Sequence, residues 1–208
     1  MIKNEISDIY IKQSSQNIYN LKNQTGDFVV KLAKHVEIKL LIINTDGDLS
    51  VTIHHEEWAK SDVQIINRYI NKKTEMVCNS NLSAGAGSDI YMLSFLTEGS
   101  DVVADANIFM MPGALWSSGH LLEENLILSP KVRIYAKPVL DVQNSQVSAS
   151  HWARISKIDN KNLFYMMSRG LSREQATAII VDWYANKILD KIDLSDEDKN
   201  FLKLEILN

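Results

Sequence analysis

A long series of short β-like runs occupies the middle of this chain, from Val36 to Trp152. The runs are rich in Val, Ile and aromatic residues, and several alternate apolar with polar positions. Turn-forming segments such as NTDGD, SAGAG and TEGSD separate them, and helix periodicity is absent. The runs read VEIKLLI, LSVTIHH, DVQIINR, TEMVCN, DIYMLSFL, DANIFMM, NLILS, VRIYA, VLDVQ and QVSASHW. This pattern predicts a mainly β body over residues 36–158, preceded by an N-terminal extension of residues 1–35.

The spacing of the runs leaves two architectures open. Their starts recur at about a dozen residues early in the series and more closely later, which fits either a sandwich or a solenoid with two strands per coil. Few Asn-Gly or Asp-Gly hairpin turns join neighbouring runs, and the spacing suits a chain that rises one rung at a time. We therefore favour the solenoid, whose open end must be capped or paired.

A helical region is expected over residues 159–208. Asp159 is a candidate N-cap for a first helix over NKNLFYMMSRG. Ser172 and Gln175 then form a capping box, and Ser195 precedes three acidic residues at the start of a third helix. The second helix has the strongest apolar stripe, formed by Ala176, Ile179, Ile180, Trp183, Ile188 and Ile192.

Composition excludes several classes of protein. The formal net charge is -4, so the chain has no uniform positive field for nucleic acid. The first residues, MIKNEISDIYIKQSS, lack the apolar stretch of a signal peptide, and no window approaches the roughly 20 apolar residues of a membrane-spanning helix. The single cysteine, Cys78, cannot form an internal disulfide, which suits a reducing compartment. We expect a soluble cytoplasmic protein with no nucleic-acid or membrane partner.

Residues 105–192 carry a resemblance to a known family. The segment NLILSPKVRIYAKPVLDVQNSQVSASHWARISKIDNKNLFYMMSRGLSREQA resembles the carboxy-terminal part of the SufB/SufD family, the scaffold proteins of iron–sulfur cluster assembly in the SUF system. Family members typically show a leucine-rich strand, a K-P-x-L-x-I strand, a short S-H-G-A-T-like turn and an I-D…L-F-Y…S-R-G-I helix, and each has a counterpart here. The preceding DANIFMMPGALWSSGHLLEEN is similar to the family's F-x-G-x-I-x-V-x-x-G-A segment.

The resemblance implies a right-handed parallel β-helix, a two-sheet solenoid, with a C-terminal α-helical subdomain. It also implies a dimer, in which the end of the β-helix pairs with a second SufB/SufD-like subunit or a second copy of this chain. The helical region would dock a SufC-like ABC-type ATPase, with Tyr165, Met166 and Arg169 as candidate contacts and Phe164 in the core. Family members are usually longer at the amino terminus.

The resemblance points to His151 as a site residue. It stands where SufD-like members carry a histidine associated with cluster assembly at the subunit interface, and a neutral imidazole is a competent iron ligand. The alternative is a histidine held by hydrogen bonds at the last rung. Where the family often has a cysteine before and a glycine after this histidine, Ala149 and Trp152 stand here.

Glu123 occupies the position that matches a functional cysteine of SufB-like members. A carboxylate can bind iron but cannot receive persulfide sulfur, which needs a thiol. Glu123 and Glu124 are therefore candidate oxygen ligands of a transient iron–sulfur cluster. Adjacent residues of a strand point to opposite faces, however, and a solvated acidic edge is the favoured alternative.

The remaining candidates favour structural roles. Cys78 lies in a β-like context in which a buried, inert thiol is more common than a reactive one. In the segment His54-His55-Glu56-Glu57, His54 and Glu56 share a face, but a metal site needs a third ligand and a polar turn is favoured. His35 and His120 have no evident partners. The glycine-rich SAGAGSD lacks the lysine of a phosphate-binding loop, so we expect no nucleotide bound by this chain.

Three functions remain open from the sequence. The first is a scaffold subunit of cluster assembly that is not itself an enzyme. The second is a degenerate family member that docks partners without binding a cluster, which the missing cysteines favour. The third is a β-helix enzyme acting on polysaccharides, although the chain has no clear cluster of Asp or Arg residues for that chemistry.

Overall fold

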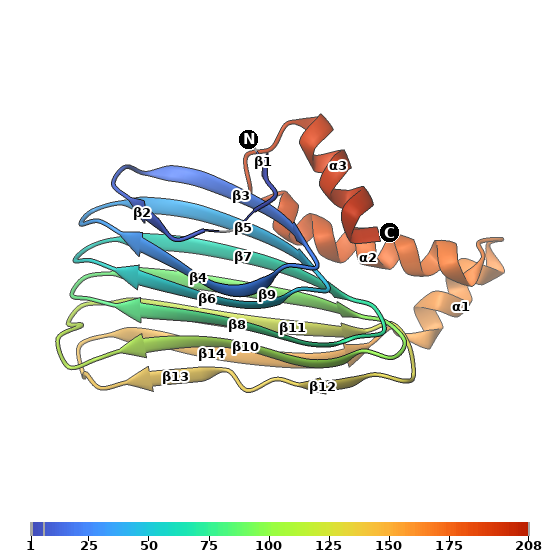
Figure 1. The fold of residues 1–208 in the computed structure, drawn as a ribbon. Coiled ribbons are helices and arrows are strands. Elements are labelled where there is room, and N and C mark those ends of the chain that lie inside the picture. The colour runs from blue at the N-terminus through green and yellow to red at the C-terminus, as the bar shows by residue number, and fades with distance from the viewer. Residues whose placement is uncertain (1, 6, 208) are drawn as a thin grey trace.

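The computed structural model describes residues 2–5 and 7–207, which form two parallel β-sheets and three helices. Successive long strands alternate between the sheets, so the chain coils as a flattened solenoid (Figure 1). Sheet A contains, in spatial order, β1 (Ile2–Lys3), β3 (Ser15–Lys22), β5 (Glu37–Thr45), β7 (Lys60–Tyr69), β9 (Gly87–Leu96), β11 (Ser118–Ile127) and β14 (Ser148–Lys157). Sheet B contains β2 (Ile9–Ile11), β4 (Thr25–Leu32), β6 (Asp48–His55), β8 (Lys73–Leu82) and β10 (Asp101–Met110), with β12 (Arg133–Tyr135) and β13 (Val139–Val142) both paired to β10. The prediction of a parallel solenoid is confirmed, and the sandwich alternative is wrong.

The solenoid begins before residue 36. Strands β3 and β4 pair in parallel with β5 and β6, so the segment 1–35, expected as an extension, already supplies strands to both sheets. The sequence pattern is weak there because β3, with the sequence SQNIYNLK, has only three fully buried apolar residues, Ile18, Tyr19 and Leu21.

The interior of the solenoid is the main hydrophobic core. Alternate residues of each strand point inward, and residues such as Leu40, Ile42, Val63 and Ile65 are inaccessible to solvent. Burying a side chain of this size contributes about 2 kcal/mol. The core therefore grows with each rung that is added, which explains why a chain of weakly similar short runs can fold as one stack.

Both corners of the central turns, from β3 to β11, use residues with positive φ. At the corner from sheet A to sheet B these are Asn23, Asp46, Asn71 and Gly99, which tolerate this conformation. At the corner from sheet B to sheet A they are His35, Trp58, Gly85 and Trp116. The Trp58 ring lies over Gly85, where an added Cβ would be 2.4 Å from two ring carbons. Gly85 is thus needed both for its φ of +66° and for the space that Trp58 occupies.

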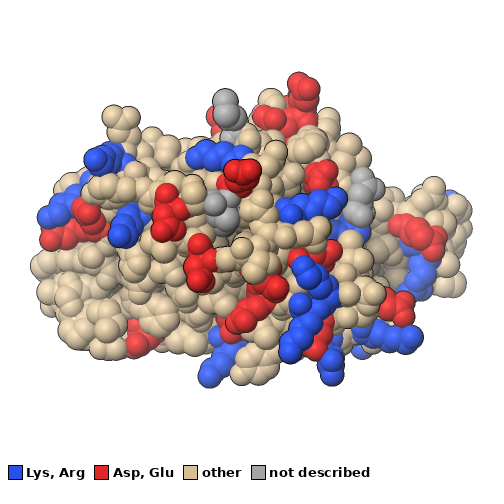
Figure 2. All heavy atoms as spheres, in the orientation of Figure 1, with Lys and Arg blue, Asp and Glu red and all other residues tan. Residues whose placement is uncertain are grey.

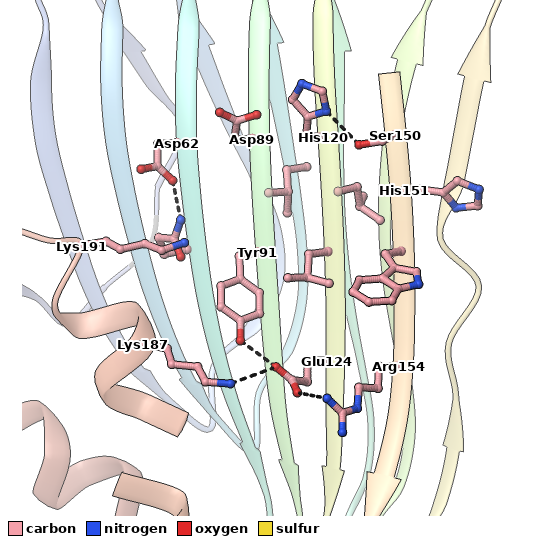
Figure 3. A pocket seen from close by; sticks show the side chains of 15 residues that line it. Asp62, Asp89, Tyr91, His120, Glu124, Ser150, His151, Arg154, Lys187 and Lys191 are labelled. Carbon is pink, nitrogen blue, oxygen red and sulfur yellow. Dashed lines mark hydrogen bonds and ion pairs between the residues drawn. The ribbon is translucent and has the colours of Figure 1, made fainter. Parts of the chain in front are cut away.

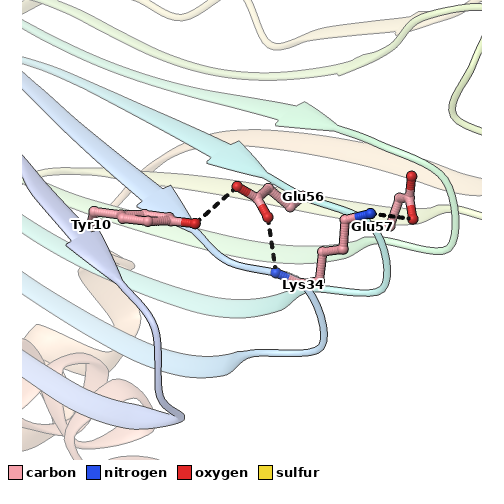
Figure 4. Close-up of polar contacts among 4 residues, drawn as sticks. All are labelled: Tyr10, Lys34, Glu56 and Glu57. Carbon is pink, nitrogen blue, oxygen red and sulfur yellow. Dashed lines mark hydrogen bonds and ion pairs between the residues drawn. The ribbon is translucent and has the colours of Figure 1, made fainter.

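A small polar network fixes the first strand of sheet B to a later corner (Figure 4). The Tyr10 hydroxyl donates to Glu56 Oε1 at 3.1 Å, and the backbone N–H of Lys34 donates to Glu56 Oε2 at 3.2 Å. Lys34 Nζ is 3.0 Å from Glu57 Oε2. The two glutamates therefore make the contacts of a polar turn, as the sequence favours.

The three helices are α1 (Asn160–Ser168), α2 (Arg173–Leu189) and α3 (Asp196–Leu207). The predicted N-terminal signals are confirmed. Asp159 accepts a hydrogen bond from the Lys161 amide, and Ser172 and Gln175 form a reciprocal capping box. The hydroxyl of Ser195 accepts from the Asp198 amide at the start of α3.

Helices α2 and α3 cover part of the outer face of sheet A, where they form a second hydrophobic core. On the sheet this core includes Leu41, Ile43, Ile66 and Leu93, and on the helices it includes Val181, Ala185, Ile188, Leu202 and Ile206. Helix α1 and the first part of α2 extend beyond the end of the sheets (Figure 1). The helical region is therefore half attached to the solenoid and half projecting from it.

Positive and negative side chains are interspersed over the face in Figure 2, without a continuous basic patch. This distribution agrees with the small net charge of -4. Within residues 2–5 and 7–207, no helix is both long and apolar enough to cross a lipid bilayer.

Candidate functional site

The last strand of sheet A, β14, leaves one end of the solenoid open. It pairs in parallel with β11 on one side, and it is the terminal strand in the order of sheet A. Nine of its ten residues are exposed, and the tenth, Ser156, is half-buried. Its outer edge therefore offers a row of backbone donors and acceptors to a further strand.

His151 lies on β14, and its side chain is on the face of sheet A opposite to the outer face. Its register partner is Leu121, whose side chain is in the inner core, so His151 is on the inner face at the open end. Figure 3 shows the imidazole directed away from the side chains on the outer face of the sheet. The side chain is exposed and no hydrogen bond holds it among the described residues. The arrangement does not support the alternative of a histidine held by hydrogen bonds.

Glu123 lies one strand further in, on the inner face of β11, and is 1% exposed. Its Oε1 accepts a hydrogen bond from the Ala106 amide, while Oε2 is buried without a partner. That amide is available because β12 and β13 pair with residues 101–103 and 107–110 of β10 and leave a gap between them. Burial raises the pKa of the Glu123 carboxyl to about 7. The expectation of a solvated acidic edge is therefore wrong for Glu123, because this side chain turns into the core.

Glu123 and His151 are on neighbouring strands but are not directly opposite. The register partner of Glu123 is Ala153, two residues beyond His151. Within the described part of the chain, no three His, Cys, Asp or Glu side chains are grouped closely enough to hold a metal ion. Cys78 is buried on β8, as the sequence predicts, and burial raises the pKa of its thiol to about 12, which disfavours the reactive thiolate.

A cavity of about 1010 Å³ lies on the outer face of sheet A, between the end of α2 and β14 (Figure 3). Glu124 is central to it. The Tyr91 hydroxyl donates to Glu124 Oε2 at 2.8 Å, Arg154 Nη1 is 3.5 Å from Oε1, and Lys187 Nζ is 4.0 Å from Oε2. Side chains from β9, β14 and α2 thus converge on one carboxylate of β11, which links helix α2 to the terminal strand.

Across the upper part of this cavity runs a polar row formed by Asp62, Asp89, His120 and Ser150. These residues are register partners on β7, β9, β11 and β14. His120 Nδ1 is 2.8 Å from Ser150 Oγ, so His120 does have a partner, one that its sequence context does not reveal. The sequence misses this cavity because its residues are distant in the chain and only the strand register brings them together.

The projecting helices carry the residues expected to contact a partner. Tyr165 and Arg169 are exposed, Met166 is half-buried, and the Arg169 guanidinium lies 5.3 Å from the centre of the Tyr165 ring. Phe164 is 75% exposed, so its expected place in the core is wrong. The reason is that α1 packs mainly against α2 and buries a single side chain, Leu163.

The residues predicted to form the apolar stripe of α2 are not all buried. Ala176, Ile188 and Ile192 are buried, whereas Ile179 and Trp183 are exposed. The buried face is completed by Val181, Ala185 and Leu189. The projecting part of the molecule therefore presents large apolar side chains on both α1 and α2.

Comparison with known proteins supports the family resemblance. Residues 5–183 match the family described as "SUF system FeS cluster assembly, SufBD core domain". An iron–sulfur cluster assembly SufBD family protein of Synechocystis is 27% identical over 207 residues, which covers 92% of this chain and 45% of the relative. A SufBD family protein of Pyrococcus horikoshii is 40% identical over 78 residues, covering 38% of this chain and 18% of the relative.

Among the similar proteins is also the iron–sulfur cluster assembly protein SufD of Escherichia coli, 27% identical over 79 residues, or 38% of this chain and 19% of that protein. The chain spans less than half the length of these relatives. The family match covers most of the chain and includes both the solenoid and the first two helices up to residue 183. This chain therefore belongs to the SufBD family of iron–sulfur cluster assembly proteins.

Proposed function

We propose that this chain is a scaffold subunit of a SUF-type iron–sulfur cluster assembly complex, with a role closer to SufD than to SufB. The observation that carries the proposal is the open end of the solenoid, where β14 has a free outer edge and presents His151. A SufD-like role is favoured because a histidine stands at position 151, while Glu123 stands where SufB-like members have a functional cysteine.

The cluster is a cargo of this complex and is assembled between two subunits. One chain supplies the exposed His151 at the open end, with Glu123 one strand behind it. Glu123 would become a ligand only by giving up its hydrogen bond to the Ala106 amide. A second β-helix subunit paired along β14 supplies the remaining ligands that a cluster needs.

Anaerobic reconstitution with iron and sulfide tests this assignment. We expect the wild-type complex to develop the visible absorption band of an iron–sulfur cluster and the His151→Ala variant to lose most of it. His120→Ala is the matched control, because His120 is on the outer face and should leave the band unchanged. Absence of a band in the wild-type complex would favour the second candidate, a family member that docks partners without a cluster.

The projecting helices dock an ABC-type ATPase of the SufC kind, which performs the ATP hydrolysis. This part of the proposal rests on the exposed apolar residues of α1 and α2, which include Phe164, Tyr165 and Trp183. Large exposed aromatic side chains of this kind are common anchors of protein interfaces. The Arg169 guanidinium beside Tyr165 adds a directional donor to the same surface.

Co-purification with a SufC-like ATPase tests the docking surface. Tyr165→Ala and Arg169→Ala should each weaken the complex by roughly tenfold or more, as truncation of an interface anchor does. Asn160→Ala is the control on the same helix, since Asn160 is exposed and, five residues before Tyr165, lies on a different face from the Tyr165–Arg169 pair. Complexes of equal strength in all three variants would contradict this surface.

A further inference from the structure

A second cavity, of about 330 Å³, lies where α2 leaves the outer face of sheet A. It is separate from the cavity beside β14, since the two share no lining residue. Phe95, Leu128 and Val181 give it apolar walls, and Arg68 and Arg173 line it as well. Small-molecule sites commonly combine such apolar walls with a few polar groups, and their volumes begin at about 300 Å³.

Arg68 is an unusual residue for this position. It lies on β7, on the outer face of sheet A, and is half-buried beneath the helices. Its Nη1 donates to the carbonyl oxygen of Ile206 near the end of α3, but its buried Nε has no acceptor. Burial lowers the pKa of the guanidinium, although arginine remains charged in proteins. A buried donor without an acceptor is unfavourable, so an acceptor that enters the cavity and pairs with this Nε–H is favoured.

Arg173 adds a second positive charge from the first turn of α2. Among the described residues, neither Arg68 nor Arg173 has a carboxylate within ion-pair distance. The carboxylate of Glu174 also lines the cavity, but it accepts a hydrogen bond from Ser172 Oγ at its own helix cap. Among the described residues that line the cavity, two guanidinium groups therefore stand against one carboxylate.

We propose that this cavity binds a small anionic ligand with an apolar body, of the kind represented by an aryl phosphate or an aryl carboxylate. The anionic group lies between Arg68 and Arg173, and the apolar body contacts Phe95, Leu128 and Val181. A guanidinium offers several donors in a planar fork that suits phosphate and carboxylate oxygens. A small molecule fits better than an acidic segment of a partner protein, because the Nε–H of Arg68 is buried inside a concave site.

Isothermal titration of the full chain with phenyl phosphate tests the proposal. We expect saturable binding by phenyl phosphate, with inorganic phosphate at least about tenfold weaker because it lacks the apolar body. Phenol, which has the ring without the charge, should bind at least about tenfold more weakly too. Arg173→Gln should weaken phenyl phosphate binding by about tenfold or more.

Two further variants separate binding from folding. Arg68→Gln removes the central donor but also the contact to Ile206, so a loss of binding there could reflect displacement of α3. Ala178→Phe keeps both arginines and fills the cavity from an exposed position on α2, and it should abolish binding. Arg133→Gln is the control, because Arg133 is exposed on β12 of the other sheet and should leave binding unchanged.

The proposal is overturned if phenyl phosphate shows no saturable binding, or if it binds Ala178→Phe and Arg173→Gln as well as it binds the wild type. Equal binding of phenol and phenyl phosphate also overturns it, since the arginines would then have no role. Absence of binding would leave the two arginines as contacts for an acidic segment of a partner. None of these outcomes depends on cluster assembly, so they are distinct from a failure of the proposed function.

Discussion

Single buried side chains determine how the stability of this solenoid depends on pH. His55 is buried at the end of β6, with Nε2 2.8 Å from Ser61 Oγ and Nδ1 3.2 Å from the carbonyl oxygen of Asn81. Because a carbonyl can only accept, Nδ1 carries the proton and Nε2 accepts from the Ser61 hydroxyl. Burial lowers the pKa of this imidazole to about 4. The folded protein therefore holds His55 in its neutral form.

We predict that His55 makes the fold sensitive to mild acid. As the pH falls from about 6.5 to about 4, the unfolded chain gains a proton at His55 that the folded chain does not. The free energy of unfolding therefore falls by about 3 kcal/mol as the solution becomes more acidic. Urea denaturation at several pH values should show a shallower fall in His55→Gln. His54→Gln, at the exposed neighbouring position, should retain the wild-type fall. Identical pH dependence in wild type and His55→Gln would contradict the prediction.

Glu123 has the opposite effect on the pH dependence of stability, because it favours the folded protein at low pH. Its folded-state pKa is raised to about 7, so as pH rises from about 4.5 to about 7 the unfolded chain loses a proton that the folded chain retains. The free energy of unfolding should therefore fall by about 3 kcal/mol as pH rises through this window. We predict that Glu123→Gln, measured without metal, is more stable than the wild type at pH 8 and shows little gain at pH 4.5.

Glu124→Gln is the matched comparison, because the adjacent carboxylate is on the outer face and contacts Tyr91, Arg154 and Lys187. Removing its charge should destabilise the protein at neutral pH, since two cations lose their partner. Stabilisation by both substitutions, or by neither, would show that the two glutamates are not in the different environments described above.

At the scale of helices and strands, one glutamine joins the helical region to the first rungs of the solenoid. The side-chain amide of Gln16 on β3 donates to the carbonyl oxygen of Asp193 at 2.6 Å and accepts from the Asp193 amide at 3.0 Å. Asp193 lies between α2 and α3. We predict that Gln16→Ala costs about 1–2 kcal/mol and speeds amide hydrogen exchange in α3 without affecting β7 to β11. Gln13→Ala, at an exposed position nearby, should change neither.

The sequence predicts elements with local signals well. The alternating runs indicate the strands, and Asp159 and the Ser172–Gln175 capping box mark two helix starts, because these signals act within a few residues. It does not predict which helix face is covered. Phe164 has helical spacing suited to a core, yet it is exposed because α1 packs mainly against α2. The cavity around Glu124 escapes prediction for a related reason, since the strand register alone unites its residues.

For the whole molecule, the open end of the solenoid determines how two subunits can meet. Two copies can pair their β14 strands antiparallel about a two-fold axis at Ala153, which overlaps residues 149–157 of each. Directly opposite residues then share a face, and Trp152 lies opposite the partner subunit's Arg154. Both are exposed on the outer face, and Trp152 is 73% exposed in the single chain. A cation over an indole ring is favourable, and two-fold symmetry provides this contact twice.

We predict that the chain forms a dimer through β14 and that its strength depends on the charge at position 152. Trp152→Lys places a like charge opposite the partner subunit's Arg154 at two symmetric positions, which should cost about 2 kcal/mol or roughly thirtyfold in the dissociation constant. Trp152→Glu places an opposite charge there and should retain the dimer. Sedimentation equilibrium over a range of concentrations measures both. If the wild type stays monomeric, or if both variants weaken the dimer equally, β14 does not pair with its own copy in this register, and the strand remains available for a different subunit.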